Sequence, residues 1–164
     1  MISLPRLVAS LSVAAILLDG QSLRVPPSSA DSKMKGQFSI LLDAPPGKAP
    51  VALQWELSVP PAMAIEKTDI LIGKAAESPG KSLVCAVKPG KPLSPGGSRY
   101  ACILAGGKDV LGPGPIAIIH YRGQADVGGA PIRVGIENIV GVSADLKRID
   151  IPKVDAIVQL KAHE

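Results

Sequence analysis

The stretch VALQWELSVPP, residues 51–61, decides the fold of this chain. Successive side chains on a β-strand point to opposite faces, so the stretch separates into two sets. One set is apolar and comprises Val51, Leu53, Trp55, Leu57 and Val59. The other is mostly polar and comprises Ala52, Gln54, Glu56 and Ser58. This alternation predicts a half-buried strand with Trp55, the only tryptophan, as its core anchor. The two prolines end the strand because they lack the N–H donors that pairing requires.

Composition indicates a single β-rich domain. The chain has 164 residues, of which 46% are hydrophobic and 20% charged, so it can bury a core of its own. Aromatic residues make up only 2%, which predicts an aliphatic core. The 17 Gly and 16 Pro are scattered between apolar runs, a spacing typical of many short strands joined by turns.

Further short apolar runs are likewise separated by residues typical of turns. We expect strands at 37–42, 68–73, 82–88, 99–104, 116–121, 131–136, 139–143, 148–151 and 154–160. With residues 51–59 there are ten candidate runs, from which we predict an all-β antiparallel sandwich of about nine strands. No run shows a helical period after the N-terminal segment, although residues 144–147 could form a single turn.

The first thirty residues are typical of an export signal. Arg6 precedes a short apolar run, residues 7–18, followed by small residues suited to cleavage. We predict a signal peptide over residues 1–22, with a cut as late as residue 30 as the alternative, then a flexible leader over 23–36 and the domain over 37–164. A buried helix or an uncleaved membrane anchor is the competing interpretation. Export would place the domain outside the cell or in the periplasm, free of the membrane.

The two cysteines fall in neighbouring predicted strands, 82–88 and 99–104. If Cys85 lies opposite Cys102, then Lys88 lies opposite Arg99, and the loop between them matches the interval rich in Pro and Gly. Facing residues of antiparallel strands lie within disulfide range, and an exported chain favours the bond. We predict a Cys85–Cys102 disulfide; two buried free thiols are the alternative.

Charge and motifs exclude several classes of function. The net charge of +4 is dispersed over single lysines and arginines, without the basic cluster typical of nucleic-acid binding. Two cysteines and two histidines without suitable spacing predict no metal and no cofactor. We find no catalytic motif and predict no enzyme. Two weaker ideas remain: a carboxylate pair drawn from Glu56, Asp69, Asp126 and Glu137, as in glycosidases, and His120 at a rim with Asp126 as its partner.

Four segments in order resemble bacterial cohesin domains. They are residues 51–60 with an aromatic and a proline turn, 70–73 ending in Gly, 114–121 beginning with Gly, and 128–134 with two Gly ahead of Ile-Arg-Val. The resemblance spans roughly residues 37–160. It implies a jelly-roll sandwich of nine strands, related in fold to one class of carbohydrate-binding modules, and a dockerin-type protein partner.

Three functions follow as hypotheses. The first is a secreted, non-catalytic module that binds another extracellular protein, a dockerin or a different partner. The second is a carbohydrate-binding module for an extracellular polysaccharide, which would need exposed aromatic rings. The third is a purely structural sandwich. For an interaction surface we name Gln54, Glu56, Ser58, Tyr100 and Tyr121 as candidates.

Overall fold

The computed structural model describes residues 20–31, 33–89, 96–124 and 131–160. Its elements are almost all strands. In chain order they are β1 (Ser22–Arg24), β2 (Ser28–Ser29), β3 (Lys35–Asp43), β4 (Ala52–Val59), β5 (Met63–Ala64), η1 (Lys67–Asp69), β6 (Ile70–Ile72), α1 (Lys74–Glu77), β7 (Ser82–Val87), β8 (Ser98–Ala105), β9 (Gly114–Gly123), β10 (Pro131–Val142), β11 (Arg148–Ile151) and β12 (Val154–Gln159).

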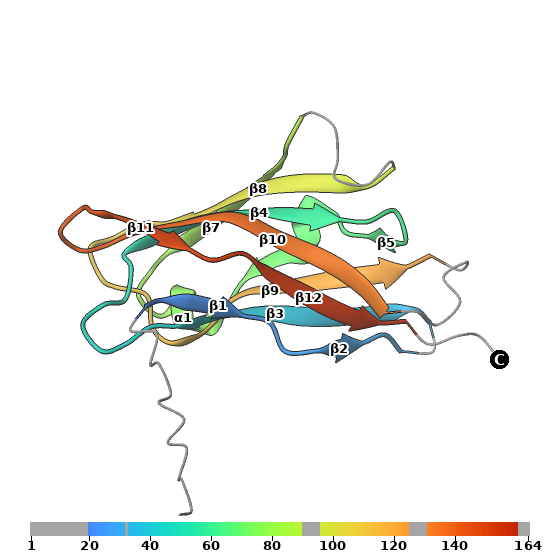
Figure 1. Cartoon of the computed structure of the whole chain (residues 1–164), viewed down its shortest axis with the longest axis horizontal. Helices are drawn as coiled ribbons and strands as arrows, with labels where there is room; N and C mark the ends of the chain where they lie inside the picture. Colours follow the sequence, from blue (N-terminus) through green and yellow to red (C-terminus); the bar gives the residue numbers. More distant parts are fainter. Residues whose placement is uncertain (1–19, 32, 90–95, 125–130, 161–164) are drawn as a thin grey trace, which may run out of the picture.

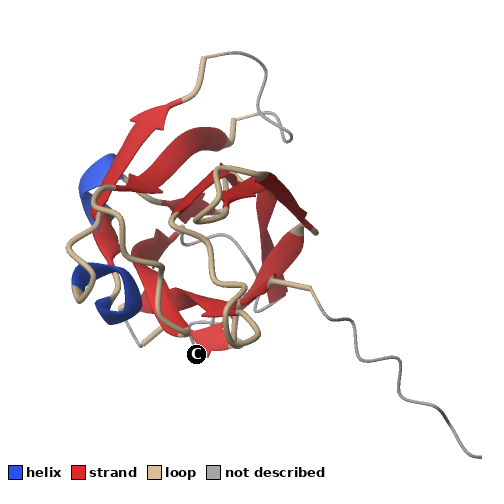
Figure 2. Cartoon of the chain, turned by 90° about the vertical axis from the view of Figure 1, so that its left-hand side faces the viewer, coloured by secondary structure: helices blue, strands red, loops and turns tan. Residues whose placement is uncertain are grey.

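The strands form two sheets that face each other as a sandwich (Figures 1 and 2). The five-stranded sheet has the order β1-β3-β9-β5, and β6 also pairs with β9. The seven-stranded sheet has the order β2-β12-β10-β4-β8-β7, and β11 pairs with β10. The described pairs are antiparallel except for the short parallel pair of β2 and β12. The architecture confirms the predicted antiparallel sandwich.

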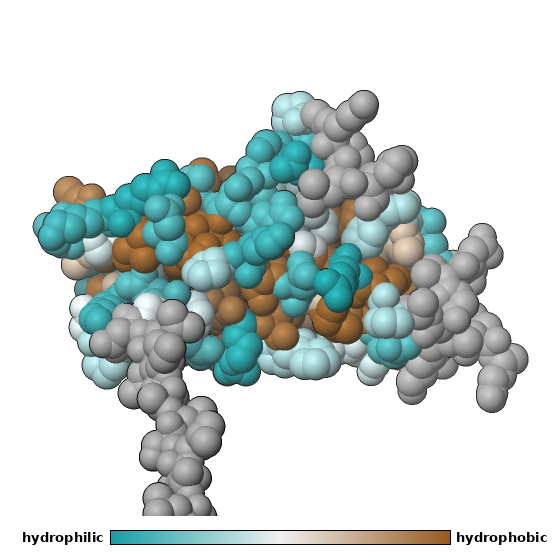
Figure 3. Space-filling model, in the orientation of Figure 1, coloured by the Kyte–Doolittle hydropathy of each residue, from teal (hydrophilic) through white to brown (hydrophobic). Residues whose placement is uncertain are grey.

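The core lies between the sheets and is built from one side of most strands. β4 shows the rule: Leu53, Trp55, Leu57 and Val59 are buried, and Trp55 is only 1% exposed. The predicted strand and its anchor are therefore confirmed. Contact between apolar side chains and water is unfavourable, so burial of these side chains drives the two sheets together. Figure 3 shows apolar residues as a band across the middle of one face, bordered by hydrophilic ones.

One predicted boundary inside the sheet is wrong. The runs 131–136 and 139–143 form a single strand, β10, rather than two. Its pairing with β4 shifts register between Glu137 and Val140, where Asn138 has a φ of 50°. Asparagine tolerates this left-handed conformation, so the strand accommodates a bulge and continues.

The position of helical turns also departs from expectation. Helical turns form at η1 and α1, which the apolar pattern did not indicate, whereas Ser143 and Lys147 close a hairpin turn between β10 and β11. Gly73 precedes α1 and has no room for a side chain: a Cβ there would lie 2.2 Å from the Pro115 carbonyl oxygen on β9. Glycine therefore lets this junction pack directly on the five-stranded sheet.

Parts of the predicted flexible leader, residues 23–36, form strands instead. β1 pairs with β3, and β2 pairs with β12, so this segment belongs to both sheets. Leu23 and Ala30 are buried at 6% and 2% exposure. Edge strands of two or three residues are too short to show alternation, which is why the sequence pattern missed them. Residues 1–19, which hold most of the predicted signal, lie outside the described residues; among the described ones no helix is long and apolar enough to cross a membrane.

Candidate partner-binding face

The seven-stranded sheet carries exposed aliphatic side chains on the side turned away from the core. We call this side of β7, β8, β4 and β10 the outer face. Val84 pairs with Ile103 and Ala86 pairs with Ala101, so these four side chains form one patch, the apolar strip. Val84 is 66% exposed and Ile103 is 54% exposed. Exposed aliphatic residues in a contiguous group are typical of interaction surfaces.

Charged side chains border the apolar strip on β4. Glu56 lies directly across from Ala101, and its carboxylate accepts hydrogen bonds from Lys88 Nζ and, at 2.6 Å, from the Arg99 guanidinium. The Glu56 and Arg99 side chains are only 15% and 19% exposed. The hydrogen bond from Lys88 is the main cause that holds the pKa of Glu56 below its ordinary value. We call Glu56, Lys88 and Arg99 the ion-pair cluster.

A small polar hollow of about 170 Å³ lies beside the ion-pair cluster, at the end of β4. Gly135 provides its floor because it has no side chain, and Glu137 Oε1 lies 3.5 Å from where a Gly135 Cβ would be. Ser58 also lines the hollow, but its Oγ is buried and has no hydrogen-bond partner among the described residues. Arg133 and Asp155 form an ion pair of 3.3 Å at the rim of the hollow. The hollow therefore presents the carboxylates of Glu137 and Asp155 to a donor from outside.

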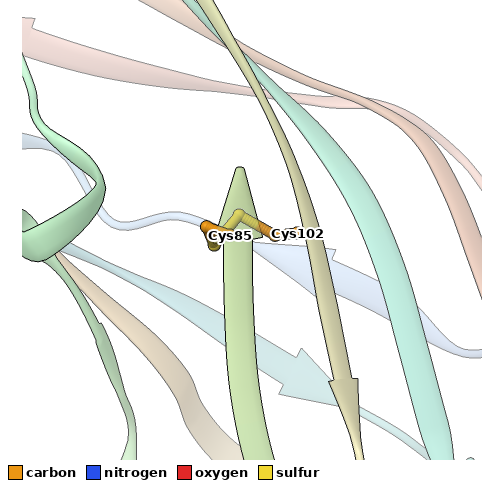
Figure 4. Close-up of a disulfide and its surroundings, with 2 residues drawn as sticks. All are labelled: Cys85 and Cys102. Atoms are coloured by element: carbon orange, nitrogen blue, oxygen red, sulfur yellow. A yellow bond between two sulfur atoms is a disulfide. The ribbon is translucent and has the colours of Figure 1, made fainter. Parts of the chain in front are cut away.

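A disulfide fastens the hairpin that carries the apolar strip. Cys85 on β7 and Cys102 on β8 are directly paired and bonded, with a Cα separation of 4.1 Å (Figure 4). The Lys88 backbone N–H donates to the Arg99 carbonyl at 2.8 Å, which is the register that the sequence predicts. The predicted bond and pairing are confirmed. Residues 90–95 of the loop between the strands are outside the described part of the chain.

Comparisons with known proteins show where this architecture recurs. No family model matches the sequence, and no curated protein matches it. Among solved structures, the cohesin of a type I cohesin–dockerin complex from Clostridium thermocellum has a TM-score of 0.70 at 13% identity, covering 87% of this chain and 99% of that one. The fold is that of a cohesin module.

Other cohesins agree with this assignment of fold. The sixth cohesin of scaffoldin B from Acetivibrio cellulolyticus, solved with a Cel5 dockerin, has a TM-score of 0.68 at 10% identity and covers 87% of this chain and 99% of that one. A non-cellulosomal cohesin from the archaeon Archaeoglobus fulgidus has a TM-score of 0.62 at 10% identity, covering 87% and 92%. At such low identity the likeness to cohesins is one of fold, so binding residues must come from this chain itself.

Some of the five candidate surface residues are exposed in this cohesin fold and others are buried. Gln54 is exposed on the outer face, and Glu56 lies there as part of the ion-pair cluster. Ser58 points to the same side but is covered by its neighbours, with 8% exposure. Tyr100 and Tyr121 are buried at 5% and 2%, so the expectation that they form a surface is wrong.

Both tyrosines point into the core and are held there by their neighbours. The Tyr100 hydroxyl donates to the Ile65 carbonyl, and the Tyr121 hydroxyl lies 3.3 Å from Ser28 Oγ. Burial raises the pKa of each phenol above its ordinary value. Phe38 packs near Tyr121 with ring centroids 6.1 Å apart. The one Phe, one Trp and two Tyr of the chain are all buried, so no aromatic ring is presented for stacking on a sugar.

The acidic and histidine candidates separate in space. Glu56 and Glu137 are cross-strand partners on β4 and β10, and Glu56 is committed to the ion-pair cluster. Asp69 lines a different hollow, together with the exposed His120, on the five-stranded sheet. Asp126, which is both the fourth carboxylate of that set and the predicted partner of His120, lies outside the described residues. In the described ranges no group of three or more His, Cys, Asp or Glu could hold a metal.

Sequence reasoning missed the residues that make the outer face distinctive. The sequence pattern places Val84 and Ile103 in strands but does not show which side of the sheet they face. It uses Arg99 and Lys88 only to set the register of the hairpin. The signal was available in the predicted disulfide: if Cys85 and Cys102 face inward, then Val84 and Ile103, one residue away on each strand, must face outward.

Proposed function

We propose that this chain is an exported, non-catalytic module that binds another protein on the outer face of β7, β8, β4 and β10. The apolar strip is the observation that carries the proposal. Four aliphatic side chains lie exposed together in the middle of two paired strands, bordered by the ion-pair cluster. An apolar centre with a charged rim is the usual anatomy of a protein interface.

The partner class follows from the fold. The cohesins of Clostridium thermocellum and Acetivibrio cellulolyticus that share this architecture were crystallised with dockerins. We therefore infer a dockerin-type partner that covers the apolar strip and places a hydrogen-bond donor in the hollow lined by Glu137 and Asp155. Burial of all the aromatic rings supports a protein partner over a polysaccharide.

Export is supported by the disulfide and by the N-terminal pattern. Disulfides persist in oxidising compartments and are rare in the cytosol, and the Cys85–Cys102 bond closes within the domain. A charged residue followed by a short apolar run precedes the first strand. Together these features favour a domain that works outside the cytoplasm.

A surface substitution tests the proposed face. The oxidised wild-type protein is immobilised and exposed to secreted proteins of the producing organism, and the bound proteins are identified by mass spectrometry. Ile103→Lys places a charge in the apolar strip and should abolish capture of a dockerin-bearing protein without lowering the melting temperature. Leu71→Lys is the matched control, since Leu71 is a 46% exposed aliphatic residue on the five-stranded sheet, and this variant should bind like wild type. Equal capture by both variants would place the interface elsewhere.

A further inference from the structure

β7 is the least anchored of the strands that carry the apolar strip. It is the last strand of its sheet and, among the described residues, pairs only with β8. None of its six residues is buried, and Val84 and Val87 are 66% and 65% exposed. Its neighbour β8 instead contributes buried Tyr100, Cys102 and Leu104 to the core. Of the β7 residues, Leu83 and Cys85 pack against the core and both are half-buried, so hydrophobic burial holds β7 more weakly than β8.

Two side-chain interactions compensate for the weak burial of β7, one on each side of the hairpin. On the core side, half-buried Cys85 is bonded to Cys102, which is fully buried among the core residues. On the outer face, Lys88 reaches across β8 to Glu56 on β4. The ion pair is partly exposed and so contributes modestly, so besides the backbone ladder with β8 the disulfide is the strongest side-chain tie that holds β7 in the sheet.

We propose that the Cys85–Cys102 bond controls the partner-binding face. While it is intact, β7 stays in the sheet and the apolar strip is complete; when a dithiol reduces it, β7 leaves β8 and removes Val84 and Ala86 from the strip. The consequence for binding rests on the proposed function, whereas release of the strand does not.

The redox step is ordinary thiol–disulfide exchange. A thiolate of the dithiol attacks the Cys85 sulfur, which is the less buried of the two, and forms a mixed disulfide while Cys102 leaves and takes up a proton. The second thiol of the reagent then closes its own disulfide and releases the Cys85 thiol. Two electrons and two protons pass in total from the dithiol to the cysteine pair.

Release should remain local because β7 contributes only the half-buried Leu83 and Cys85 to the core. The fully buried side chains come from other elements, and Trp55 and Leu57 on β4 stay covered by β8 and by the opposite sheet. Strand alternation places the ladder hydrogen bonds of β7 at Val84, Ala86 and Lys88, and the bond from Lys88 is observed at 2.8 Å. These three amides therefore report on whether β7 is paired.

Hydrogen exchange of the full chain, with and without dithiothreitol, tests strand release. We expect the Val84, Ala86 and Lys88 amides to exchange at least about tenfold faster after reduction, with amides of β3 and β10 unchanged. A Cys85→Ser, Cys102→Ser double variant should show the same pattern without reductant. Unchanged exchange in β7 overturns the proposal, and so does loss of protection throughout both sheets, which would mean that the bond holds the whole fold.

Binding supplies the second arm of the test. The protein captured by wild type but not by Ile103→Lys is titrated onto the oxidised protein and onto the double variant, and affinity should fall at least about tenfold in the variant. If the oxidised protein and the double variant bind with equal affinity although β7 is released in the variant, the proposal that the disulfide controls the face is overturned. If no such partner is captured, the proposed function fails, while hydrogen exchange still decides whether the strand is released.

Discussion

At the scale of single residues, Trp55 contributes most to the join between the sheets. It is the largest fully buried side chain, 1% exposed, and it sits on the central strand opposite Cys102. Its indole N–H finds no hydrogen-bond partner among the described residues, so its contribution comes from packing rather than from a polar contact. A binding role for this ring has no support because its surface is enclosed.

Replacing Trp55 by Ala should therefore lower the free energy of unfolding by about 3–5 kcal/mol, through lost burial and a cavity left behind. Urea unfolding of wild type and variant measures the difference. Leu71→Ala is the control, because Leu71 is 46% exposed and its loss should change stability by no more than about 0.5 kcal/mol. Unaltered stability in the Trp55 variant would mean that the ring is not part of the core.

At the scale of elements, the β7–β8 hairpin depends on contacts that it makes across neighbouring strands. The disulfide joins its two arms, and Glu56 of β4 binds both Lys88 and Arg99 at the end of the hairpin. Because the Glu56 side chain is only 15% exposed, its charge is partly shielded from water and its hydrogen bonds matter more than those of a surface pair.

Glu56 should give the hairpin a pH-dependent stability. Its hydrogen bond from Lys88 lowers the pKa in the folded state below the ordinary value of 4.5. A lowered folded-state pKa means that the stabilisation is fully present above 4.5 and is lost as the pH falls through the folded-state value. Glu56→Gln should cost about 1–2 kcal/mol at neutral pH and progressively less below 4.5.

Urea unfolding across this pH range checks the prediction. Asp150→Asn is the control, because Asp150 and Arg148 form an ion pair with side chains 75% and 69% exposed, which should contribute little at any pH. A constant difference between wild type and Glu56→Gln from neutral to acid pH would show that the charge of Glu56 is not involved.

At the scale of the whole molecule, the sandwich is closed at one edge by its N-terminal segment. β1 extends the five-stranded sheet and β2 extends the seven-stranded sheet, so a few residues connect both layers (Figure 1). Leu23 and Ala30 are buried by this arrangement. If the predicted signal peptide is cleaved, the position of the cut bears on folding: a cut after Ser22 keeps both side chains, whereas a cut after Ala30 removes them.

A protein that begins at residue 31 should be less stable than one that begins at residue 20. Loss of Leu23 burial alone corresponds to about 1.5–3 kcal/mol, which for a domain of this size lowers the melting temperature by several degrees. Circular dichroism melts of the two proteins measure this. Equal melting temperatures would show that β1 and β2 add nothing to the fold, and a later cut would then be harmless.

Local alternation accounts for what the sequence predicted well. Residues 51–59 have apolar side chains at the odd-numbered positions and mostly polar ones at the even-numbered positions, so the pattern predicts the buried face of β4 without ambiguity. The same arithmetic placed Cys85 opposite Cys102, since a hairpin register follows from two strands and the loop between them. Fold class, the core anchor and the disulfide are therefore properties of local pattern.

Tertiary structure decided the faces that local pattern leaves ambiguous. In residues 99–104 apolar side chains occur at both odd- and even-numbered positions. Only packing against β4 and the opposite sheet therefore shows that Tyr100 faces inward and Ile103 outward. Short β1 and β2 have no period to detect and exist because β3 and β12 offer them unpaired backbone groups. Alternation therefore predicts most of the longer strands, because it is a local property of the chain. Which surfaces remain free depends on the tertiary structure, because a face is covered by elements that are distant in the chain.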